Sequence, residues 1–346
     1  MIWHPLALSI WLLDITAGLI YIGAGWRLLV LLPQWQTGSS AAGQLWRERA
    51  LELTAYQGRW TMGLLTVSLV LVLVGLTNVW PAQVAGAMCG TGVLQAMGPA
   101  GHHSLIFRVL TLGLLYCWQV IQRLDSTHPG AFLARTQGRL LLLAAPLIVL
   151  STLTFGQALA AVVPESVVSC CALLYEQARG VNAGPLLSAA GLSERTWGVV
   201  FFCGAVGVAC AGAWQWRRPT VLNKPRGMIT AAATAAWIPM AIVYLKSGVA
   251  PYIYQVLAHH CAWCLFLTLH GAVGFVYFGL LAWIGAETAA GLTVRAVVPQ
   301  HAPLHSVARM RVSTAGLRIL AGALLFVALS AAPALFWRIQ SGSWIF

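Results

Sequence analysis

Charged side chains are scarce in this sequence, and acidic residues are scarcer than basic ones. Only 8% of the 346 residues are charged, whereas 59% are hydrophobic. A soluble globular protein has about 25% charged residues, so this composition excludes an ordinary soluble domain. The net charge of +12 does not indicate a nucleic-acid-binding protein, because the basic residues are scattered over many loops and form no stripe interleaved with aromatic residues. The loops also lack a glycine-rich nucleotide-binding motif.

The sequence contains instead a series of long hydrophobic runs. About 20 apolar residues are enough for a helix to cross the hydrocarbon core of a bilayer. The first run is too long for the apolar h-region of a signal peptide and has no basic segment before it, so we interpret it as a membrane span. We predict an all-α, polytopic protein with a single integral membrane domain that is embedded in the lipid bilayer. The expected spans are residues 6–32, 60–80, 104–122, 140–163, 196–216, 228–247, 261–285 and 317–337.

The basic residues predict how these spans are oriented. Fourteen of the 20 Lys and Arg residues fall on one set of alternating loops, and four fall on the opposite loops and tails. Loops that are rich in Lys and Arg stay in the cytoplasm. We therefore expect a multi-pass protein of a bacterial inner (plasma) membrane. Both termini and the candidate cysteine sites should then lie on the periplasmic side.

Cysteine sites recur at a similar interval in the outward loops. Cys89, Cys170 and Cys261 are 81 and 91 residues apart, and each lies at the outward end of a predicted hairpin. This spacing indicates a loose internal repeat of three helical hairpins, with the first and last helices at the flanks. The shared composition of membrane loops is the alternative explanation. We expect the three sites to meet on one face of the membrane.

The most specific motif is Cys261-Ala-Trp-Cys264, which follows His259 and His260 at the start of the seventh expected span. On a helix the two thiols lie near one face, and the positive N-terminus of that helix lowers a thiol pKa. The motif therefore fits a redox pair. It also fits a pair of metal ligands, for which both histidines are further candidates. Two structural cysteines buried in an apolar helix are a third interpretation.

Cys170 and Cys171 form an adjacent pair in the loop after the fourth expected span. A disulfide between neighbours in sequence is strained and therefore easily reduced. One thiol could instead exchange with another cysteine site while its neighbour resolves the mixed disulfide. Two adjacent soft thiolates could equally hold Cu(I), and chance adjacency of two small apolar residues is the remaining alternative.

The loop of Met88 and Cys89 is followed by His102 and His103. Cys, Met and His are the donors that a copper site uses, so these four residues are candidate metal ligands. The alternative is a glycine-rich loop that closes onto the membrane, with histidines at the interface.

A few polar residues fall within the predicted spans. Asp14 lies inside the first span, where an ionisable group is costly unless it is paired, and Arg108 in the third span is its expected partner. The pair is either structural or part of a proton relay. His270 in the seventh span is a candidate for binding a quinone head, with a hydrogen-bonded core histidine as the alternative. Haem is disfavoured, because the histidine pairs lie at span ends rather than in mid-membrane.

Two resemblances follow from these motifs. The segment Tyr254-Gln-Val-Leu-Ala-His-His-Cys-Ala-Trp-Cys-Leu-Phe resembles the membrane Cys-x-x-Cys helix of vitamin K epoxide reductase and DsbB-type disulfide-forming proteins. This resemblance implies exchange with a loop cysteine pair, for which Cys170-Cys171 would stand in, and electron transfer to a quinone. The whole chain resembles a family of bacterial multi-pass inner-membrane proteins with Gly-Ala-Met-Cys, Ser-Cys-Cys and His-His-Cys-x-x-Cys motifs, which implies the architecture alone.

Three hypotheses for function follow from the sequence. The first is thiol–disulfide exchange or electron relay at the periplasmic face, linked to a quinone and to a periplasmic thiol protein. The second is binding and transfer of a soft metal, most plausibly Cu(I), in exchange with a metal-carrying protein. The third is a structural or assembly subunit of a membrane complex, in which the cysteines serve packing.

Overall fold

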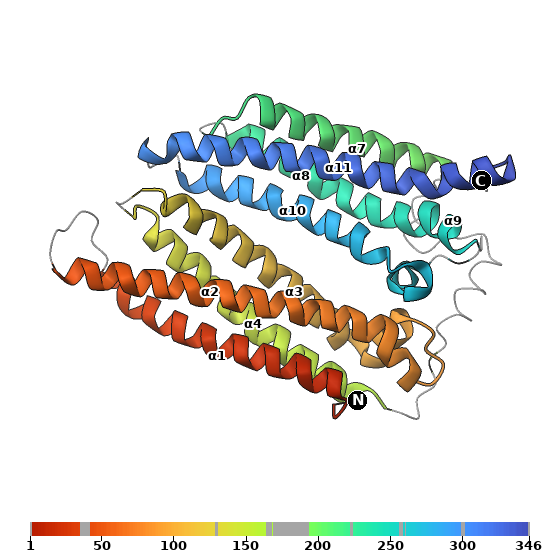
Figure 1. Ribbon diagram of the computed structural model, residues 1–346, viewed down its shortest axis with the longest axis horizontal. Coiled ribbons are helices and arrows are strands. Elements are labelled where there is room, and N and C mark those ends of the chain that lie inside the picture. The colour runs from red at the N-terminus through yellow and green to blue at the C-terminus, as the bar shows by residue number, and fades with distance from the viewer. Residues whose placement is uncertain are drawn as a thin grey trace. The chain divides into compact units, whose positions relative to one another are not determined.

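The chain is almost entirely helical in the computed structural model (Figure 1). The structure describes residues 2–34, 42–128, 131–163, 168, 194–221, 224–255, 259, 261–298 and 302–344. Within these ranges, 8 helices are long and apolar enough to cross a membrane, and no strand is present. The predicted all-α, polytopic class is confirmed.

The long helices match the eight predicted spans in order, although most of them extend further. They are α1 (Pro5–Gln34), α2 (Ala42–Val74), α3 (Gly90–Asp125), α4 (Ala134–Ala161), α7 (Glu194–Arg217), α8 (Lys224–Tyr244), α10 (Gly274–Val297) and α11 (His305–Ser341). The second one begins far before residue 60, because the polar stretch ahead of the apolar run continues the same helix. Hydropathy locates the part of a helix that lies in lipid, not the point where its hydrogen bonding starts.

The seventh span, expected over 261–285, is wrong at its start. Its first part forms two short 3₁₀ helices, η4 (Ala262–Phe266) and η5 (Thr268–His270), before α10 begins. Gly271 and Ala272 follow with φ of +69° and +51°. These left-handed values cannot continue a right-handed helix, so the chain turns here and α10 starts afresh.

The chain divides into two compact units, which we call the first and second units. The first unit contains residues 1–75, 94–163 and 292–311, and therefore α1, α2, α4 and most of α3. The second unit contains residues 76–93, 164–291 and 312–346, and therefore α7, α8 and most of α10 and α11. Each unit has its own buried apolar core.

In the first unit, α1 packs against α2 and α4. Ala17, Tyr21, Ala24 and Leu28 follow one another at helical spacing and are all buried in this core. The alanines allow neighbouring helix backbones to come close, as small residues do between membrane helices. The Tyr21 hydroxyl donates a hydrogen bond to the carbonyl oxygen of Leu141 on α4. This bond fixes the axial position of α1 relative to α4.

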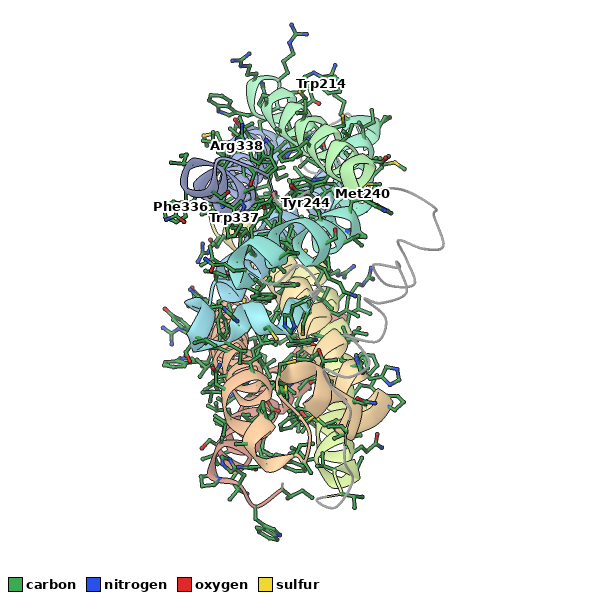
Figure 2. The ribbon with its side chains drawn as sticks, turned by 90° about the vertical axis from the view of Figure 1, so that its right-hand side faces the viewer. Trp214, Met240, Tyr244, Phe336, Trp337 and Arg338 are labelled. Carbon is green, nitrogen blue, oxygen red and sulfur yellow. The ribbon has the colours of Figure 1, made fainter. Side chains whose placement is uncertain are left out.

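In the second unit, aromatic stacking and a close glycine contact hold the helices together. The rings of Phe201 on α7 and Tyr244 on α8 are stacked with centroids 4.2 Å apart (Tyr244 is labelled in Figure 2). Trp237 Nε1 on α8 donates a hydrogen bond of 3.2 Å to the carbonyl oxygen of Phe201. A Cβ added at Gly316 on α11 would lie 2.7 Å from the carbonyl oxygen of Gly212 on α7, so the backbones of α7 and α11 touch directly.

This contact predicts that Gly316→Ala destabilises the protein. The new methyl group would also lie 2.5 Å from the backbone nitrogen of Trp216, and overpacking against rigid backbone costs about 1–3 kcal/mol. Gly279→Ala on α10 is the matched control, because nothing lies within 4 Å of its added Cβ. We expect the thermal unfolding midpoint in detergent to fall for Gly316→Ala and to stay or rise for Gly279→Ala. Equal midpoints for the two variants would contradict the close contact.

Candidate functional site

Three buried thiols converge in the second unit. Cys89 directly precedes α3, Cys261 directly precedes η4, and Cys264 lies within η4. Their Sγ atoms all lie within 4.8 Å of one another, and the Sγ atoms of Cys89 and Cys261 are 3.4 Å apart. The three residues are exposed by only 0%, 4% and 5%. Residues 172 positions apart in sequence are therefore brought to one buried point, which we call the thiol cluster.

The start of η4 brings the two cysteines of the motif close together. Cys261 precedes the helix with an extended backbone, and Cys264 follows within the first turn of about three residues. The prediction that this motif opens a long α-helix is wrong, because the positive φ values at Gly271 and Ala272 interrupt it. The positive end of α10 therefore does not act on the thiols, and His270 does not lie further along the same helix.

Gly90 allows the two cysteine segments to meet. A Cβ at Gly90 would lie 2.9 Å from Cε3 of Trp263, so the indole ring packs directly onto the backbone next to Cys89. Trp263 is the third residue of the Cys-x-x-Cys motif, and Gly90 is the residue after Cys89. The contact between Gly90 and Trp263 therefore packs the segment of Cys89 against the segment of Cys261 and Cys264.

The side chain of Asn78 holds the non-α segment that carries the motif. Asn78 lies in the π-helical turn η1 (Gly75–Val79), which continues α2. Its Nδ2 donates to the carbonyl oxygen of Phe266 at 3.3 Å, and its Oδ1 accepts from the backbone N–H of Thr268 at 3.2 Å. One amide therefore satisfies a backbone acceptor and a backbone donor on either side of Leu267. Asn78 was not predicted from the sequence; the available signal was an amide at the end of a long apolar run.

Hydrogen bonds to the Cys261 sulfur favour its thiolate. The pKa of Cys261 is held well below its ordinary value by the hydrogen bond with Cys264, then by the one with Cys89, and further by Thr91, while burial acts in the opposite direction. The Oγ1 atom of Thr91 lies 3.2 Å from the Cys261 Sγ. The Tyr254 hydroxyl donates to the backbone carbonyl of Cys261 at 2.7 Å, which fixes the position of this residue.

Two histidines lie at the edge of the thiol cluster. His259 Nε2 is 3.2 Å from the Cys264 Sγ, close enough for both atoms to bind one ion. The ring of Tyr254 contacts His259 and His270, with centroid distances of 4.9 Å and 4.5 Å. Burial first, and then the nearby His259, lowers the pKa of His270. His270 therefore adjoins the cluster through Tyr254.

The other candidate residues from the sequence fall in different places. Cys170, Cys171 and His260 lie outside the residues that the structure describes. Met88 is 68% exposed beside the buried Cys89. His102 and His103 are exposed on α3, in the part of that helix that belongs to the first unit. Of the predicted site residues, the structure thus brings together Cys89, Cys261, Cys264 and His259.

The predicted pairing of Asp14 with Arg108 is confirmed in the first unit. The guanidinium donates to both carboxylate oxygens, at 2.9 Å and 2.5 Å, and each side chain is 1% exposed. Ser68 on α2 lies 2.6 Å from both Asp14 Oδ1 and Arg108 Nη1. The ring of Phe155 on α4 covers the guanidinium at 4.9 Å. The charges are thus paired and shielded, and four helices meet around them.

Removing one partner of this pair should destabilise the first unit strongly. Asp14→Ala would leave the buried Arg108 charge uncompensated, at a cost of about 3–5 kcal/mol. The double variant Asp14→Ala/Arg108→Met removes both charges, so it should recover part of the loss. The measurement is the thermal unfolding midpoint in detergent. A double variant less stable than Asp14→Ala would show that the pair is not the source of the effect.

Comparison with known proteins identifies no relative of this chain. No protein-family model matches the chain, and neither a curated protein nor a solved structure matches it. The resemblance of residues 254–266 to the vitamin K epoxide reductase and DsbB-type proteins stays a prediction.

Proposed function

We propose that the thiol cluster binds a thiophilic metal ion, with Cu(I) as the first candidate. The observation that carries this proposal is the convergence of Cys89, Cys261 and Cys264 within 4.8 Å. A metal–thiolate bond is about 2.3 Å long, so three sulfurs around one ion lie about 4 Å apart. The thiols need little movement to reach that spacing. Soft thiolates select Cu(I) and Zn²⁺ over harder ions such as Mg²⁺ or Ca²⁺.

Cu(I) and Zn²⁺ both fit these thiolate ligands, but they differ in the number of ligands that they need. Three mutually close sulfurs suit Cu(I), which accepts low coordination numbers, and the buried surroundings protect it from water and oxidants. A structural Zn²⁺ site takes four ligands, among them the Cys₃His combination. His259 can supply that fourth ligand, because its Nε2 is 3.2 Å from the Cys264 Sγ. Zn²⁺ is therefore the competing ion, and its binding should depend on His259 more than that of Cu(I).

The place of the cluster in the chain supports a role at a membrane surface. Cys89 precedes the span that begins at Gly90, and Cys261 and Cys264 lie between the spans Pro225–Tyr254 and Gly274–Val297. The excess of Lys and Arg on the opposite loops favours the periplasmic side for these segments. We infer that the protein accepts or delivers its ion at the periplasmic face of a bacterial inner membrane, in exchange with a soluble metal-carrying protein.

Metal titration tests the proposal directly. The reduced, full-length protein in detergent should take up one Cu(I) in competition with a chromogenic Cu(I) chelator. Loss of a supporting residue around a metal costs about 10–100-fold in affinity, so Cys89→Ser, Cys261→Ser and Cys264→Ser should each cost at least as much. His259→Gln should weaken Zn²⁺ binding more than Cu(I) binding.

Cys203→Ser is the matched control for the titration. Cys203 lies in the second unit but is exposed on α7, so its loss should leave the affinity unchanged. A wild-type protein that releases all Cu(I) to the chelator would contradict the proposal. Equal weakening by Cys203→Ser would contradict the assignment of the ligands.

A second candidate function, thiol–disulfide exchange, is favoured by the distance of 3.4 Å between the sulfurs of Cys89 and Cys261. A disulfide needs about 2.05 Å between sulfurs, so a small approach would join them. Oxidation of the two thiols to a disulfide would release two electrons and two protons, and a quinone would take up both to become a quinol. Cys264 would then attack the Cys261 sulfur, which forms a Cys261–Cys264 disulfide and releases Cys89 as a thiolate. A reduced periplasmic thiol protein would take over that disulfide by exchange and leave Cys261 and Cys264 as thiols. His270 is the residue at which we place the quinone head.

Differential alkylation with mass spectrometry separates the two functions. Protein extracted without reductant should contain a disulfide between Cys89 and Cys261, or between Cys261 and Cys264, if exchange is its function. Metal binding predicts three reduced thiols that react only after a Cu(I) chelator is added. Alkylation of the fully unfolded protein, in which every thiol is accessible, controls for the reagent. Three reduced thiols that react only on unfolding, with or without chelator, would contradict both functions and favour a structural role.

A further inference from the structure

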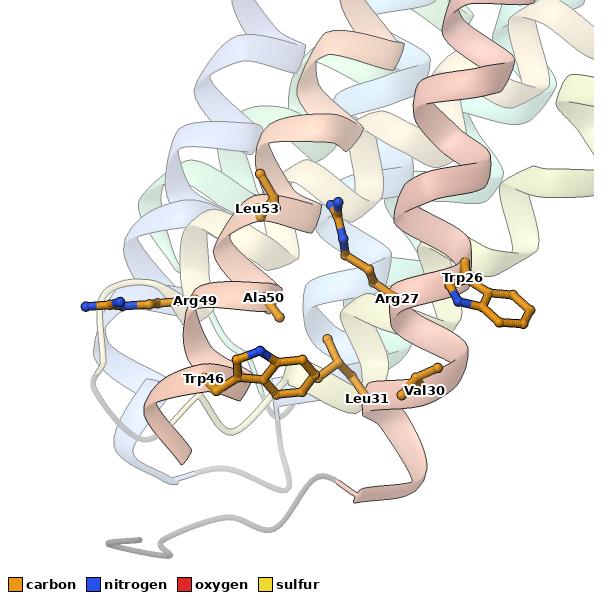
Figure 3. A pocket seen from close by; sticks show the side chains of 8 residues that line it. All are labelled: Trp26, Arg27, Val30, Leu31, Trp46, Arg49, Ala50 and Leu53. Atoms are coloured by element: carbon orange, nitrogen blue, oxygen red, sulfur yellow. The ribbon is translucent and has the colours of Figure 1, made fainter. Parts of the chain in front are cut away.

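A second feature of the molecule lies in the first unit, at the end where α1 stops and α2 starts. Here the two helices enclose a hollow of about 370 Å³ (Figure 3). It is lined by Trp26, Arg27, Val30 and Leu31 from α1, and by Trp46, Arg49, Ala50 and Leu53 from α2. We call this feature the α1–α2 hollow.

The walls of the α1–α2 hollow are apolar, and tryptophans stand at its edges. The four residues from α2 recur at spacings of three and four, so they form one continuous face of that helix. Trp26 and Trp46 are 70% and 59% exposed. Exposed tryptophans near the ends of membrane helices lie at the level of lipid headgroups. The hollow therefore opens towards lipid at the boundary between the acyl chains and the headgroups.

Two arginines give the α1–α2 hollow its charge. Arg27 extends from α1 towards α2 at one end of the hollow, and Arg49 projects outwards from α2 (Figure 3). Arg27 Nη1 donates to Gln57 Oε1 at 2.6 Å, but a neutral amide leaves the positive charge in place. Among the residues that the structure describes, neither arginine has a carboxylate within ion-pair distance.

The surrounding sequence adds no compensating charge. Residues 35–41, which connect α1 to α2, contain no Asp or Glu. The nearest carboxylates on α2, Glu48 and Glu52, are not among the residues that line the hollow. Positive charge beside apolar walls at the headgroup level is complementary to a lipid phosphate, whose oxygens accept charge-assisted hydrogen bonds from guanidinium groups.

We propose that the α1–α2 hollow binds the headgroup of an anionic phospholipid of the phosphatidylglycerol class. Arg27 and Arg49 lie on different sides of the hollow and supply positive charge around the headgroup, and the apolar residues Val30 and Leu53 contact the acyl chains of the lipid. Basic pockets between membrane helices at the headgroup level bind anionic lipids in this way. The apolar walls favour a lipid over a soluble phosphate ion, which would gain nothing from them. The site is independent of the thiol cluster and of the metal proposed there.

Native mass spectrometry of the full-length protein tests this site. The probes are phosphatidylglycerol and phosphatidylcholine, offered at equal concentration to delipidated protein in detergent. We expect the wild type to retain severalfold more phosphatidylglycerol, and Arg49→Gln and Arg27→Gln each to remove most of that difference. Arg47→Gln is the matched control, because it removes the same charge from α2 outside the lining of the hollow.

The outcomes distinguish a lipid site from other sources of binding. Equal retention of the two lipids by the wild type would overturn the proposal, and so would an equal loss for Arg47→Gln. Displacement of phosphatidylglycerol by millimolar inorganic phosphate would assign the site to a soluble anion instead. Arg49 is exposed and Arg27 is half-buried, so Arg49→Gln keeps the test decisive if Arg27→Gln does not fold.

Discussion

Buried backbone that leaves the α-helix must find hydrogen-bond partners inside the protein, and the thiol cluster depends on this constraint. Between Cys261 and the start of α10 the chain forms two 3₁₀ helices and a left-handed turn. Asn78 accepts from one backbone N–H there and donates to one backbone carbonyl, and the Tyr254 hydroxyl satisfies another carbonyl. Without these side chains the segment would gain most by extending α10 towards Cys261. The cysteines of the motif would then follow the course of a continuous helix.

The two units bury polar chemistry in contrasting ways. In the first unit, Asp14 and Arg108 neutralise each other, and Ser68 and Phe155 contact the pair. That cluster is self-contained, which suits a role in fixing helix positions. In the second unit, the thiol cluster gathers groups of one kind, and deprotonation would give it negative charge that nothing within the cluster offsets. A bound cation, or the formation of a disulfide, removes that imbalance. The contrast is the physical reason to place function at the thiols and structure at the ion pair.

Much of this architecture could be predicted from the sequence, and particular residues show where prediction stopped. The apolar runs located the eight spans, and the cost of a charge in lipid was enough to pair Asp14 with Arg108. The break before α10 was not predicted, because residues 261–285 are mostly apolar and hydropathy carries no information on φ at Gly271 or Ala272. The contact of Gly90 with Trp263 depends on tertiary packing, which spacing along the chain does not encode. The predicted meeting of the cysteine sites holds for Cys89 with Cys261 and Cys264, whereas Cys170 and Cys171 lie outside the described residues.

The burial of the three sulfurs affects the rate at which the thiol cluster can exchange an ion or electrons with a partner. Cys89 is fully buried, and the indole of Trp263 covers the backbone beside it, so an ion or oxidant has little direct access to this sulfur. A local opening would provide that access, for example release of the turn held by the two hydrogen bonds of Asn78. Exchange is then limited by how often that turn opens, whatever the concentration of the incoming partner. Such a protein would retain what it binds over many encounters and release it when a partner holds the turn open.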